Sequence, residues 1–261
     1  MKWSFSNDIP IYAQLIEQIK VGIATGGGSE HLPLFMGYVG EGMLDGCAIG
    51  GVFQSPSAEQ MAAVTREIDS GAGVLYIYGN YTGDTINFEM AQDLVDFDDI
   101  KVIHVRGSED VASAPKEEKD KRRGVAGIYF VFKCAGAAAD AMLPLEEVAR
   151  VAQKAADNVR TMGVALTPCI IPENGKANFS IADGRMELGM GIHGEPGVKE
   201  CDILTADEVV DTMLDSILPD LPYVAGDEVA VLINGLGGTP LEEQYIMYRR
   251  VHQVLTEKGI K

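Results

Sequence analysis

The stretch GVLYIYGNYTGDTINFEMAQDLVDFDDIKVIHV, residues 73–105, combines a buried strand, a polar loop, a helix and a second strand. GVLYIY at 73–78 is an uninterrupted apolar run, as in a strand that is covered on both faces. Residues 85–97 space their apolar side chains as a helix does, and KVIHV at 101–105 returns to a strand pattern. Strands joined by such a crossover pair in parallel, so the stretch predicts an α/β fold.

The same alternation of strands and helices continues on both sides of this stretch. Residues 11–20 have helical spacing, and KVGIAT at 20–25 predicts a short strand. Ser57-Ala-Glu-Gln60 fits a capping box and predicts a helix to about Asp69. Residues 144–162 open at a proline and keep helical spacing up to a Met-Gly stop.

The C-terminal part of the chain repeats this pattern. We expect strands from GVALTP, RMELGMGI and EVAVLI and helices from two longer segments, at residues 163–168, 185–192, 228–233, 205–218 and 239–258. The last helix would use Thr239 as its cap and Pro240 as its first residue. The sequence therefore predicts two α/β domains that share a substrate cleft, residues 1–162 and 163–261.

The formal net charge of −18 argues against nucleic acid as a partner. Binding to nucleic acid depends on Lys and Arg side chains that neutralise phosphates, and this chain would repel them. Its strongest basic cluster, Lys116 to Arg123, alternates with acidic residues. We interpret that cluster as a solvated loop.

Cysteine spacing and the N-terminus narrow the class of protein further. Cys47, Cys134, Cys169 and Cys201 form no C-x-x-C pair, so we expect four buried apolar thiols rather than a zinc or redox site. The N-terminus turns polar at once, and no run approaches about 18 apolar residues. These features predict a cytoplasmic protein without a membrane partner.

Three polar, glycine-rich loops each follow a predicted strand: GGGSEH at 26–31, NYTGD at 80–84 and GIHGEPG at 191–197. Strand ends are where α/β sheets place ligands, and glycines let the backbone approach a ligand closely. The histidine and aspartate side chains can transfer protons, donate hydrogen bonds or act as nucleophiles. These loops are therefore the candidate site.

Each candidate residue also has a structural interpretation. His31 could be a loop histidine with a backbone partner, and Asp84 could cap a helix that begins at Thr85. His193 lies between two glycines ahead of Glu-Pro-Gly, which is too constrained for an ordinary linker. Two histidines and an aspartate would also suit zinc or iron, but nothing in their spacing requires a metal, and we expect none.

Nucleotide-binding motifs are weak or absent. GMGIHG at 189–194 matches G-x-G-x-x-G, but the sequence after it does not continue as the helix that a dinucleotide site needs. No G-x-x-x-x-G-K-[ST] motif is present. The sequence therefore indicates that this chain does not bind ATP through a P-loop.

Taken together, the motifs resemble one family. GGGSEHLPLFMGYVGEGML, VFQSP, NYTGDTINFEMA, RRGVAG, GVALTPC, MELGMGIHGEPG and NGLGGTPLEEQYIMYRRV occur in the order and context of the dihydroxyacetone-binding subunits of dihydroxyacetone kinases. The resemblance covers about residue 20 to the C-terminus. Their joint occurrence is far more specific than any single glycine motif.

The resemblance implies roles for the loop residues. His193 would attack the ketone carbonyl and hold the substrate as a covalent hemiaminal, which excludes polyols without a carbonyl. Asp84 would accept the proton of the hydroxyl to be phosphorylated, and His31 would orient that hydroxyl. The substrate-binding residues would be Gly28, Ser29, Glu30, His31, Asp84 and His193.

The resemblance also implies the partners. This chain would bind no cofactor itself, since ADP or ATP with magnesium lies on a separate nucleotide-bearing subunit. A phosphocarrier of the phosphotransferase system recharges that nucleotide in many relatives. The family leads us to expect a homodimer that acts as a glycerone kinase.

The chain departs from the family pattern in the substrate pocket. The glycine loop of the family reads GGGSGHEP, so Glu30 and Leu32 replace a glycine and an acid here. Gly79 stands where the family has a lysine. Glu30 would either raise the pKa of His31 through its charge or crowd the substrate with its side chain.

Both ends of the chain depart as well. Residues 1–24 resemble the opening helix of a GntR-type regulator, and the chain ends before the segment that completes the second domain of the family. An incomplete domain would leave sheet edges uncovered and lower stability. Two alternatives to a kinase subunit therefore follow: a dihydroxyacetone-binding coactivator of a transcription regulator, and a truncated inactive homologue.

Overall fold

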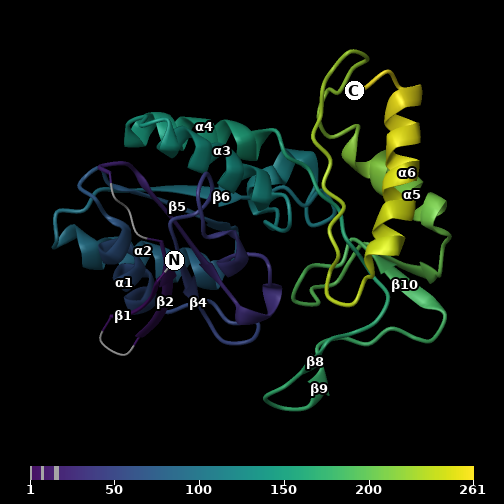
Figure 1. Cartoon of the computed structure of the whole chain (residues 1–261). Helices are drawn as coiled ribbons and strands as arrows, with labels where there is room; N and C mark the ends of the chain where they lie inside the picture. Colours follow the sequence, from purple (N-terminus) through teal and green to yellow (C-terminus); the bar gives the residue numbers. More distant parts are fainter. Residues whose placement is uncertain (1, 7–8, 15–17) are drawn as a thin grey trace. The chain divides into compact units, whose positions relative to one another are not determined.

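A computed structural model of the protein describes residues 2–6, 9–14 and 18–261 (Figure 1). These residues form two compact units. The first unit comprises the described residues up to Glu109 together with Ala126–Val159, and the second comprises Asp110–Val125 and Arg160–Lys261. Residues 110–125, which the sequence analysis assigned to the first domain, therefore group with the second unit.

The first unit is built on a six-stranded sheet with the order β1-β2-β4-β3-β5-β6. Strands β4, β3, β5 and β6 pair in parallel, and β2 pairs antiparallel with both β1 and β4. The strands are Lys2–Ser6 (β1), Ile9–Ala13 (β2), Gly22–Gly27 (β3), Gly46–Ile49 (β4), Val74–Gly79 (β5) and Val102–Gly107 (β6). The predicted α/β fold with a parallel sheet is confirmed.

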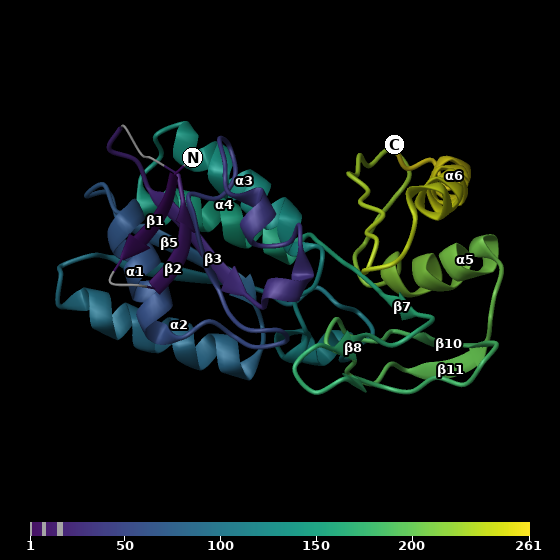
Figure 2. The same cartoon turned by 60° about the horizontal axis from the view of Figure 1, so that its bottom comes forward.

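Helices cover both faces of this sheet (Figures 1 and 2). Helices α1 and α2 lie on one face and α3 and α4 on the other. Their bounds are Ala58–Ile68 (α1), Thr82–Asp96 (α2), Ile128–Asp140 (α3) and Leu145–Asp157 (α4), with short 3-10 helices at Ser29–His31 (η1) and Met36–Tyr38 (η2). Along the described residues, no helix has both the length and the apolar character that crossing a membrane requires.

Strand β5 explains why the sequence is apolar without interruption at residues 73–78. Leu75 and Ile77 pack into the core beneath α3 and α4, whereas Tyr76 and Tyr78 pack into the core beneath α1 and α2. Alternate side chains of a strand point to opposite faces, so a strand with helices on both faces must be apolar at every position.

The capping box that starts α1 is confirmed. The Gln60 amide donates to the Ser57 hydroxyl at 3.3 Å, and the Ser57 amide donates to the Gln60 side chain at 2.9 Å. Both donors would otherwise be unsatisfied at the helix start.

The helix predicted over residues 11–20 is wrong in its first part. Ile9–Ala13 form β2, and the backbone of Ile11–Ala13 pairs with Gly46–Ala48 of β4. Ile11 and Ala13 are buried in the core beneath α1 and α2. Long-range pairing therefore overrode the local helical spacing, and residues 15–17 of the predicted helix lie outside the described residues.

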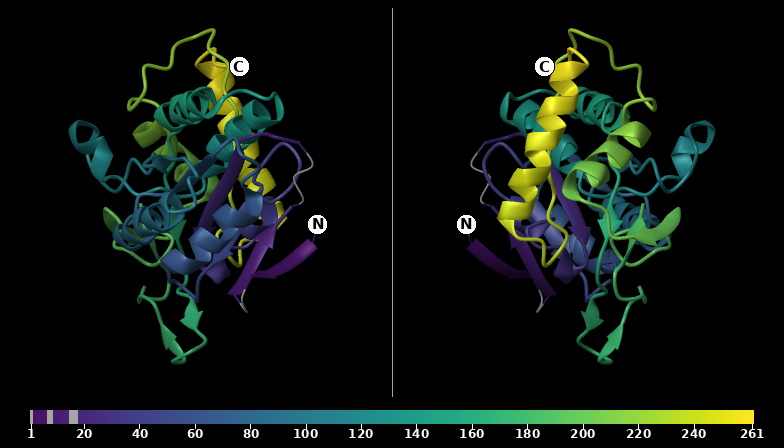
Figure 3. Two further views of the ribbon diagram at one scale, coloured as in Figure 1. Left: turned by 90° about the vertical axis from the view of Figure 1, so that its left-hand side faces the viewer. Right: turned by 90° about the vertical axis from the view of Figure 1, so that its right-hand side faces the viewer.

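The second unit combines short antiparallel strands with two helices. A three-stranded sheet has the order β11-β10-β7, and β8 pairs with β9. Helices α5 and α6 lie side by side (Figure 3). The elements are Val164–Ala165 (β7), Ile170–Ile171 (β8), Lys176–Ala177 (β9), Arg185–Leu188 (β10), Lys199–Asp202 (β11), Ala206–Ile217 (α5) and Leu241–Glu257 (α6).

Two local predictions fail in this unit. EVAVLI at 228–233 is not a strand, because a strand needs a neighbouring ladder; the Val229 amide instead donates to the Lys261 carbonyl at 2.8 Å. The last helix begins at Leu241, and Pro240 itself is the N-cap, without a side-chain cap. The predicted Thr239 cap is therefore wrong by one position.

The cysteine prediction holds only in part. Cys47 is buried, but Cys134 and Cys169 are exposed and Cys201 is half-buried. Burial raises the pKa of the Cys47 thiol, which keeps it neutral.

The basic cluster is not uniformly solvated. Residues Lys116–Lys121 form an exposed 3-10 helix (η3), but Arg122 is only 2% exposed. Its guanidinium donates to both carboxylate oxygens of Asp220, at 2.9 and 2.7 Å, and Arg160 pairs with the same carboxylate. The hydrogen bond from Arg122, aided by Arg160, lowers the pKa of Asp220 to about 2. This pairing ties residues 110–125 to the second unit.

We predict that Arg122→Ala lowers the free energy of unfolding by about 3 kcal/mol, because it removes a bidentate partner from a buried carboxylate. Urea denaturation measures the change. Lys121→Ala, an exposed neighbour in the same basic run, is the matched control and should shift stability by less than about 0.5 kcal/mol. Equal effects of the two substitutions would contradict a structural role for the buried pair.

Candidate functional site

The loops that follow β3, β4 and β5 lie together at the carboxyl edge of the parallel sheet, where these three strands end side by side. The chain leaves β3 to form β4 on one side and later β5 on the other, which makes this edge a switch point for ligand binding. The amide of Ser29 donates to a carbonyl of the β4 loop at 3.3 Å. The rings of His31 and Phe53 lie 6.2 Å apart, and the Ser55 hydroxyl donates to Asp84 at 2.5 Å. The β4 loop thus links the two predicted loops that carry His31 and Asp84.

Glycine is required where these loops approach one another. A Cβ on Gly27 would fall within the Phe35 ring, and a Cβ on Gly28 would collide with the Glu30 carboxylate. Glycine at residues 27 and 28 therefore leaves room for the side chains of Phe35 and Glu30.

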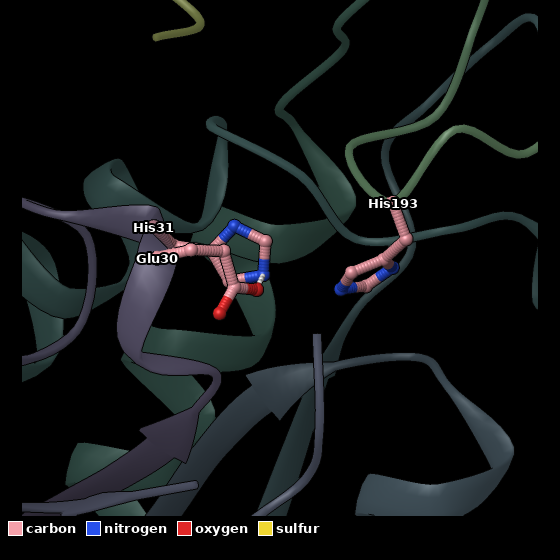
Figure 4. Close-up of side chains that lie close together, drawn as sticks. All are labelled: Glu30, His31 and His193. Atoms are coloured by element: carbon pink, nitrogen blue, oxygen red, sulfur yellow. Dashed lines mark ion pairs between the residues drawn. The ribbon is translucent and has the colours of Figure 1, made fainter. Parts of the chain in front are cut away.

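His31 is paired with the residue before it. Its Nε2 lies 2.8 Å from Oε1 of Glu30, and both side chains are largely buried, at 6% and 14% exposure (Figure 4). Burial opposes ionisation of Glu30, but electrostatic interactions of its carboxylate with His31 and with the backbone amides of Phe53 and Glu30 outweigh burial. The pKa of Glu30 therefore lies below its usual value. Glu30 is an anion held against His31.

Two aromatic residues that the sequence analysis did not single out hold the His31 ring. Phe35 and Phe53 both meet it edge-on, with centroids 5.7 and 6.2 Å away. Both residues have a positive φ, 63° and 55°. Such a φ is rare for a bulky side chain, and residues that adopt it are found most often at functional sites. The VFQSP motif contains Phe53 and could have pointed to it, but the positive φ of this residue cannot be predicted from the sequence.

Asp84 lies in the first turn of α2, whose N-cap is Tyr81. The alternative in which Asp84 caps a helix from Thr85 is therefore wrong. Its carboxylate is close to the positive end of the helix dipole and accepts the hydrogen bond from Ser55.

In the second unit, His193 lies on the loop that follows β10 (Figure 4). Its Nδ1 is 2.9 Å from Oε1 of Glu195, and its amide donates to the other carboxylate oxygen at 3.0 Å. Burial opposes ionisation of Glu195, but the hydrogen bonds from His193 prevail and lower the pKa of Glu195 to about 2. An ionised carboxylate only accepts, so Nδ1 carries the proton and the ring lone pair is on Nε2.

A buried ion pair supports the backbone of this loop. Arg123 donates to Asp110 at 3.0 Å and to the Gly189 carbonyl at 2.9 Å. Burial raises the pKa of Asp110, against the opposing effect of Arg123. Gly194 has a φ of 88°, and a Cβ there would meet Asn178. The RRGVAG motif contains Arg123, but its partner 13 residues earlier could not be read from it.

The dinucleotide alternative fails on geometry. The chain runs from Gly194 into β11 without a helix, so GMGIHG lacks the helix N-terminus that a pyrophosphate needs.

Comparison with known proteins identifies the family. The model of the Dak1 domain matches residues 5–261. The chain belongs to the Dak1 family. It is 47% identical over 247 residues to PTS-dependent dihydroxyacetone kinase 2, dihydroxyacetone-binding subunit DhaK, of Listeria innocua, covering 95% of this chain and 74% of that relative. Because the Dak1 match begins at residue 5 and β1 and β2 are strands, the resemblance of residues 1–24 to a GntR-type helix does not hold.

Solved structures of relatives have the same fold as this chain. The dihydroxyacetone kinase of C. freundii superimposes with a TM-score of 0.88 at 36% identity, over 97% of this Dak1 chain and 46% of that one. A second structure of that enzyme, in complex with AMP-PNP and Mg²⁺, gives the same score at 35% identity, over 96% and 46% of the chains. The dihydroxyacetone kinase operon co-activator Dha-DhaQ gives 0.86 at 29% identity, over 93% and 75%.

We predict that the Glu195 carboxylate makes part of the stability of this Dak1 chain dependent on pH. Its pKa is lower in the folded chain, so the stabilisation is complete above pH 4.5 and is lost as the pH falls to about 2. The amount should be about 1–2 kcal/mol, since about a third of the side chain is exposed and solvent screens the pair.

Urea denaturation of the wild type and Glu195→Gln at a series of pH values measures this effect. The difference between the two free energies of unfolding should shrink across that window. Exposed Glu173→Gln is the control and should show a constant difference. A constant difference for Glu195→Gln as well would disprove the pairing with His193.

Proposed function

We propose that this chain is the substrate-binding subunit of a dihydroxyacetone kinase, which holds dihydroxyacetone covalently on His193. The observation that carries the proposal is the Glu195–His193 pair, in which a carboxylate on Nδ1 leaves the lone pair on Nε2. The name of the Listeria relative and the superposition on the C. freundii enzyme support it.

The chemistry of His193 follows from this tautomer. Nε2 attacks the ketone carbon, a C–N bond forms, and the carbonyl oxygen takes the π electrons and then a proton from water. The ring gains positive charge as the bond forms, and the Glu195 carboxylate stabilises that charge at 2.9 Å. Glycerol has no carbonyl and cannot form the hemiaminal, so covalent attachment selects the ketone.

The loops at the sheet edge of the first unit would handle the hydroxyl that receives the phosphoryl group. Asp84 would accept the proton of this hydroxyl and His31 would orient it, and Gly28 and Ser29 would bring backbone close to the ligand. Removal of the hydroxyl proton leaves an oxygen that attacks the phosphoryl group in line.

The phosphoryl donor would be a nucleotide on a partner subunit, which needs magnesium and either ATP or an ADP that is rephosphorylated in place. The complex of the C. freundii enzyme with AMP-PNP and Mg²⁺ supports a nucleotide and metal in the complete kinase. The word PTS-dependent in the name of the Listeria relative favours recharging by a phosphotransferase-system phosphocarrier. We also propose that the subunit is a homodimer.

A second candidate function is ligand binding without turnover. The superposition on the co-activator Dha-DhaQ supports it, because that protein shares the fold. In this case the hemiaminal on His193 would form and would signal to a transcription regulator.

We predict that dihydroxyacetone raises the mass of the intact chain by one substrate molecule and that His193→Ala abolishes this adduct. Mass spectrometry of the native chain measures the adduct, and mixing with a nucleotide-bearing partner subunit and ATP measures product phosphate. Activity should fall at least about 10³-fold in the variant, since covalent attachment positions the substrate.

His252→Ala, an exposed histidine on α6, is the matched control and should retain both adduct and activity. An adduct on His193 without turnover would favour the coactivator. An adduct that survives His193→Ala would refute covalent binding at that residue.

A further inference from the structure

One side chain at the base of the β8–β9 hairpin is hydrogen-bonded to the backbone of His193. The Nδ2 amide of Asn178 donates to the His193 carbonyl at 3.2 Å, and its Oδ1 accepts from the Cys169 amide at 2.9 Å. A carbonyl only accepts and a backbone amide only donates, so these two partners determine which way the Asn178 side chain faces. The hairpin and the His193 loop both belong to the second unit.

The backbone of Asn178 closes the hairpin. Strands β8 and β9 pair over residues 170–171 and 176–177. The Asn178 amide donates to the Cys169 carbonyl at 3.0 Å, and together with the side-chain bond from the Cys169 amide this adds a further pair to the ladder. The side chain that reaches His193 therefore starts from a backbone that is itself held in place.

The bond from Asn178 holds the peptide unit between His193 and Gly194. The carbonyl of this unit accepts from Asn178, and its N–H, on Gly194, donates to the Gly191 carbonyl at 3.1 Å. Gly194 has a φ of 88°, and a Cβ there would lie 2.9 Å from Nδ2 of Asn178. The side chain of Asn178 thus occupies the space that glycine leaves, and the peptide unit is held at both ends.

Glu195 holds the remaining backbone group of His193 and its ring. Oε2 of Glu195 accepts from the His193 amide at 3.0 Å, and Oε1 lies 2.9 Å from Nδ1. The direction of a side chain follows from the backbone that bears it, so rotation of the 193–194 peptide unit would move the ring relative to Glu195. The contacts of Asn178 and Glu195 therefore act together on one ring.

We propose that Asn178 is a positioning residue for covalent attachment: its amide holds the His193 carbonyl, so that the ring keeps the orientation in which Nε2 attacks the ketone. This inference rests on the proposed function and deepens it, because it places a determinant of His193 reactivity on a hairpin outside the GIHGEPG loop. Attack requires closely aligned reacting atoms, so a small displacement of the ring has a large effect. In this role Asn178 acts through His193 and not on the substrate.

Asn178→Asp removes the bond to His193 selectively. One aspartate oxygen still accepts from the Cys169 amide, so the hairpin stays closed, whereas the other replaces Nδ2 and repels the His193 carbonyl. The loop then adopts other orientations, and the apparent affinity falls with the fraction of chains in the competent one. We expect the dissociation constant of dihydroxyacetone, measured from the mass of the adduct, to rise at least about tenfold.

Turnover distinguishes positioning from a general loss of structure. With saturating dihydroxyacetone, a nucleotide-bearing partner subunit and ATP, we expect kcat of Asn178→Asp to stay within about twofold of the wild type, because the ring is already attached to the substrate. All measurements are made at about pH 8.5, roughly two units above the ordinary histidine pKa, so that the added charge does not act by protonating a histidine. A fall in kcat as large as the loss of affinity overturns the positioning role.

Asn174→Asp is the matched control, because it makes the same change in the turn of the same hairpin. Asn174 is exposed, and its Oδ1 accepts from the Lys176 amide at 2.8 Å, a bond that aspartate keeps. The dissociation constant should stay within about twofold of the wild type. Asn178→Ala removes the bond to His193 without adding charge and should also weaken binding at least about tenfold. Equal effects of the two aspartate variants, or wild-type affinity in Asn178→Ala, contradict the proposal.

The ring of His193 can also be followed without substrate. Nitrogen-15 NMR, assigned with His193→Ala, should show Nδ1–H in the wild type and in Asn174→Asp, and signals averaged between the two ring nitrogens in Asn178→Asp. Hydrogen exchange of residues 169–178 should be the same in all three chains. Identical ring signals, or faster exchange of the hairpin in Asn178→Asp, overturn the role of Asn178.

The two levels of the argument fail separately. If the wild type forms no adduct, the proposed function is refuted, and the ring signals still decide on Asn178. If the wild type forms the adduct and Asn178→Asp binds dihydroxyacetone with unchanged affinity, the proposed function stands and only the role of Asn178 is refuted.

Discussion

Parallel pairing of β3 with β4 on one side and β5 on the other is the constraint on which the site of the first unit depends. Because the three strands run the same way, their following loops must meet at one edge, and the reversal of strand order opens that edge to a ligand. The contacts of His31 with Phe53 and of Ser55 with Asp84 are consequences of this pairing. Strand β5, apolar at every position, anchors the arrangement between two helical layers.

Carboxylate–imidazole pairs then give the loops their chemistry. Glu195 and Glu30 each lie against a histidine ring, Glu195 at Nδ1 of His193 and Glu30 at Nε2 of His31. The pKa of both acids is lowered because interactions with the neighbouring histidine and with backbone amides outweigh burial. Both pairs join a glutamate to a histidine. They differ in which ring nitrogen faces the carboxylate, and the backbone of each loop sets that difference.

Local signals explain which parts of the fold were predictable. The Ser57 capping box, the apolar run of β5 and the helix after Pro144 depend on neighbours within a few residues, and all three were predicted. The predictions that failed at residues 11–13 and 228–233 share one cause: a strand exists only where another segment supplies its ladder. Arg122 was likewise interpreted as solvated because its partner Asp220 is distant in sequence.

The sequence by itself determined the α/β class, the family resemblance and the three loops that carry His31, Asp84 and His193, since motif order and apolar periodicity are written along the chain. Tertiary structure alone decided which nitrogen of each histidine faces a carboxylate, that Phe35 and Phe53 hold the His31 ring, and that Asp84 accepts from Ser55. The physical reason is that hydrogen-bond direction and left-handed φ depend on the positions of atoms from separate loops. Those positions are set only when the strands pair.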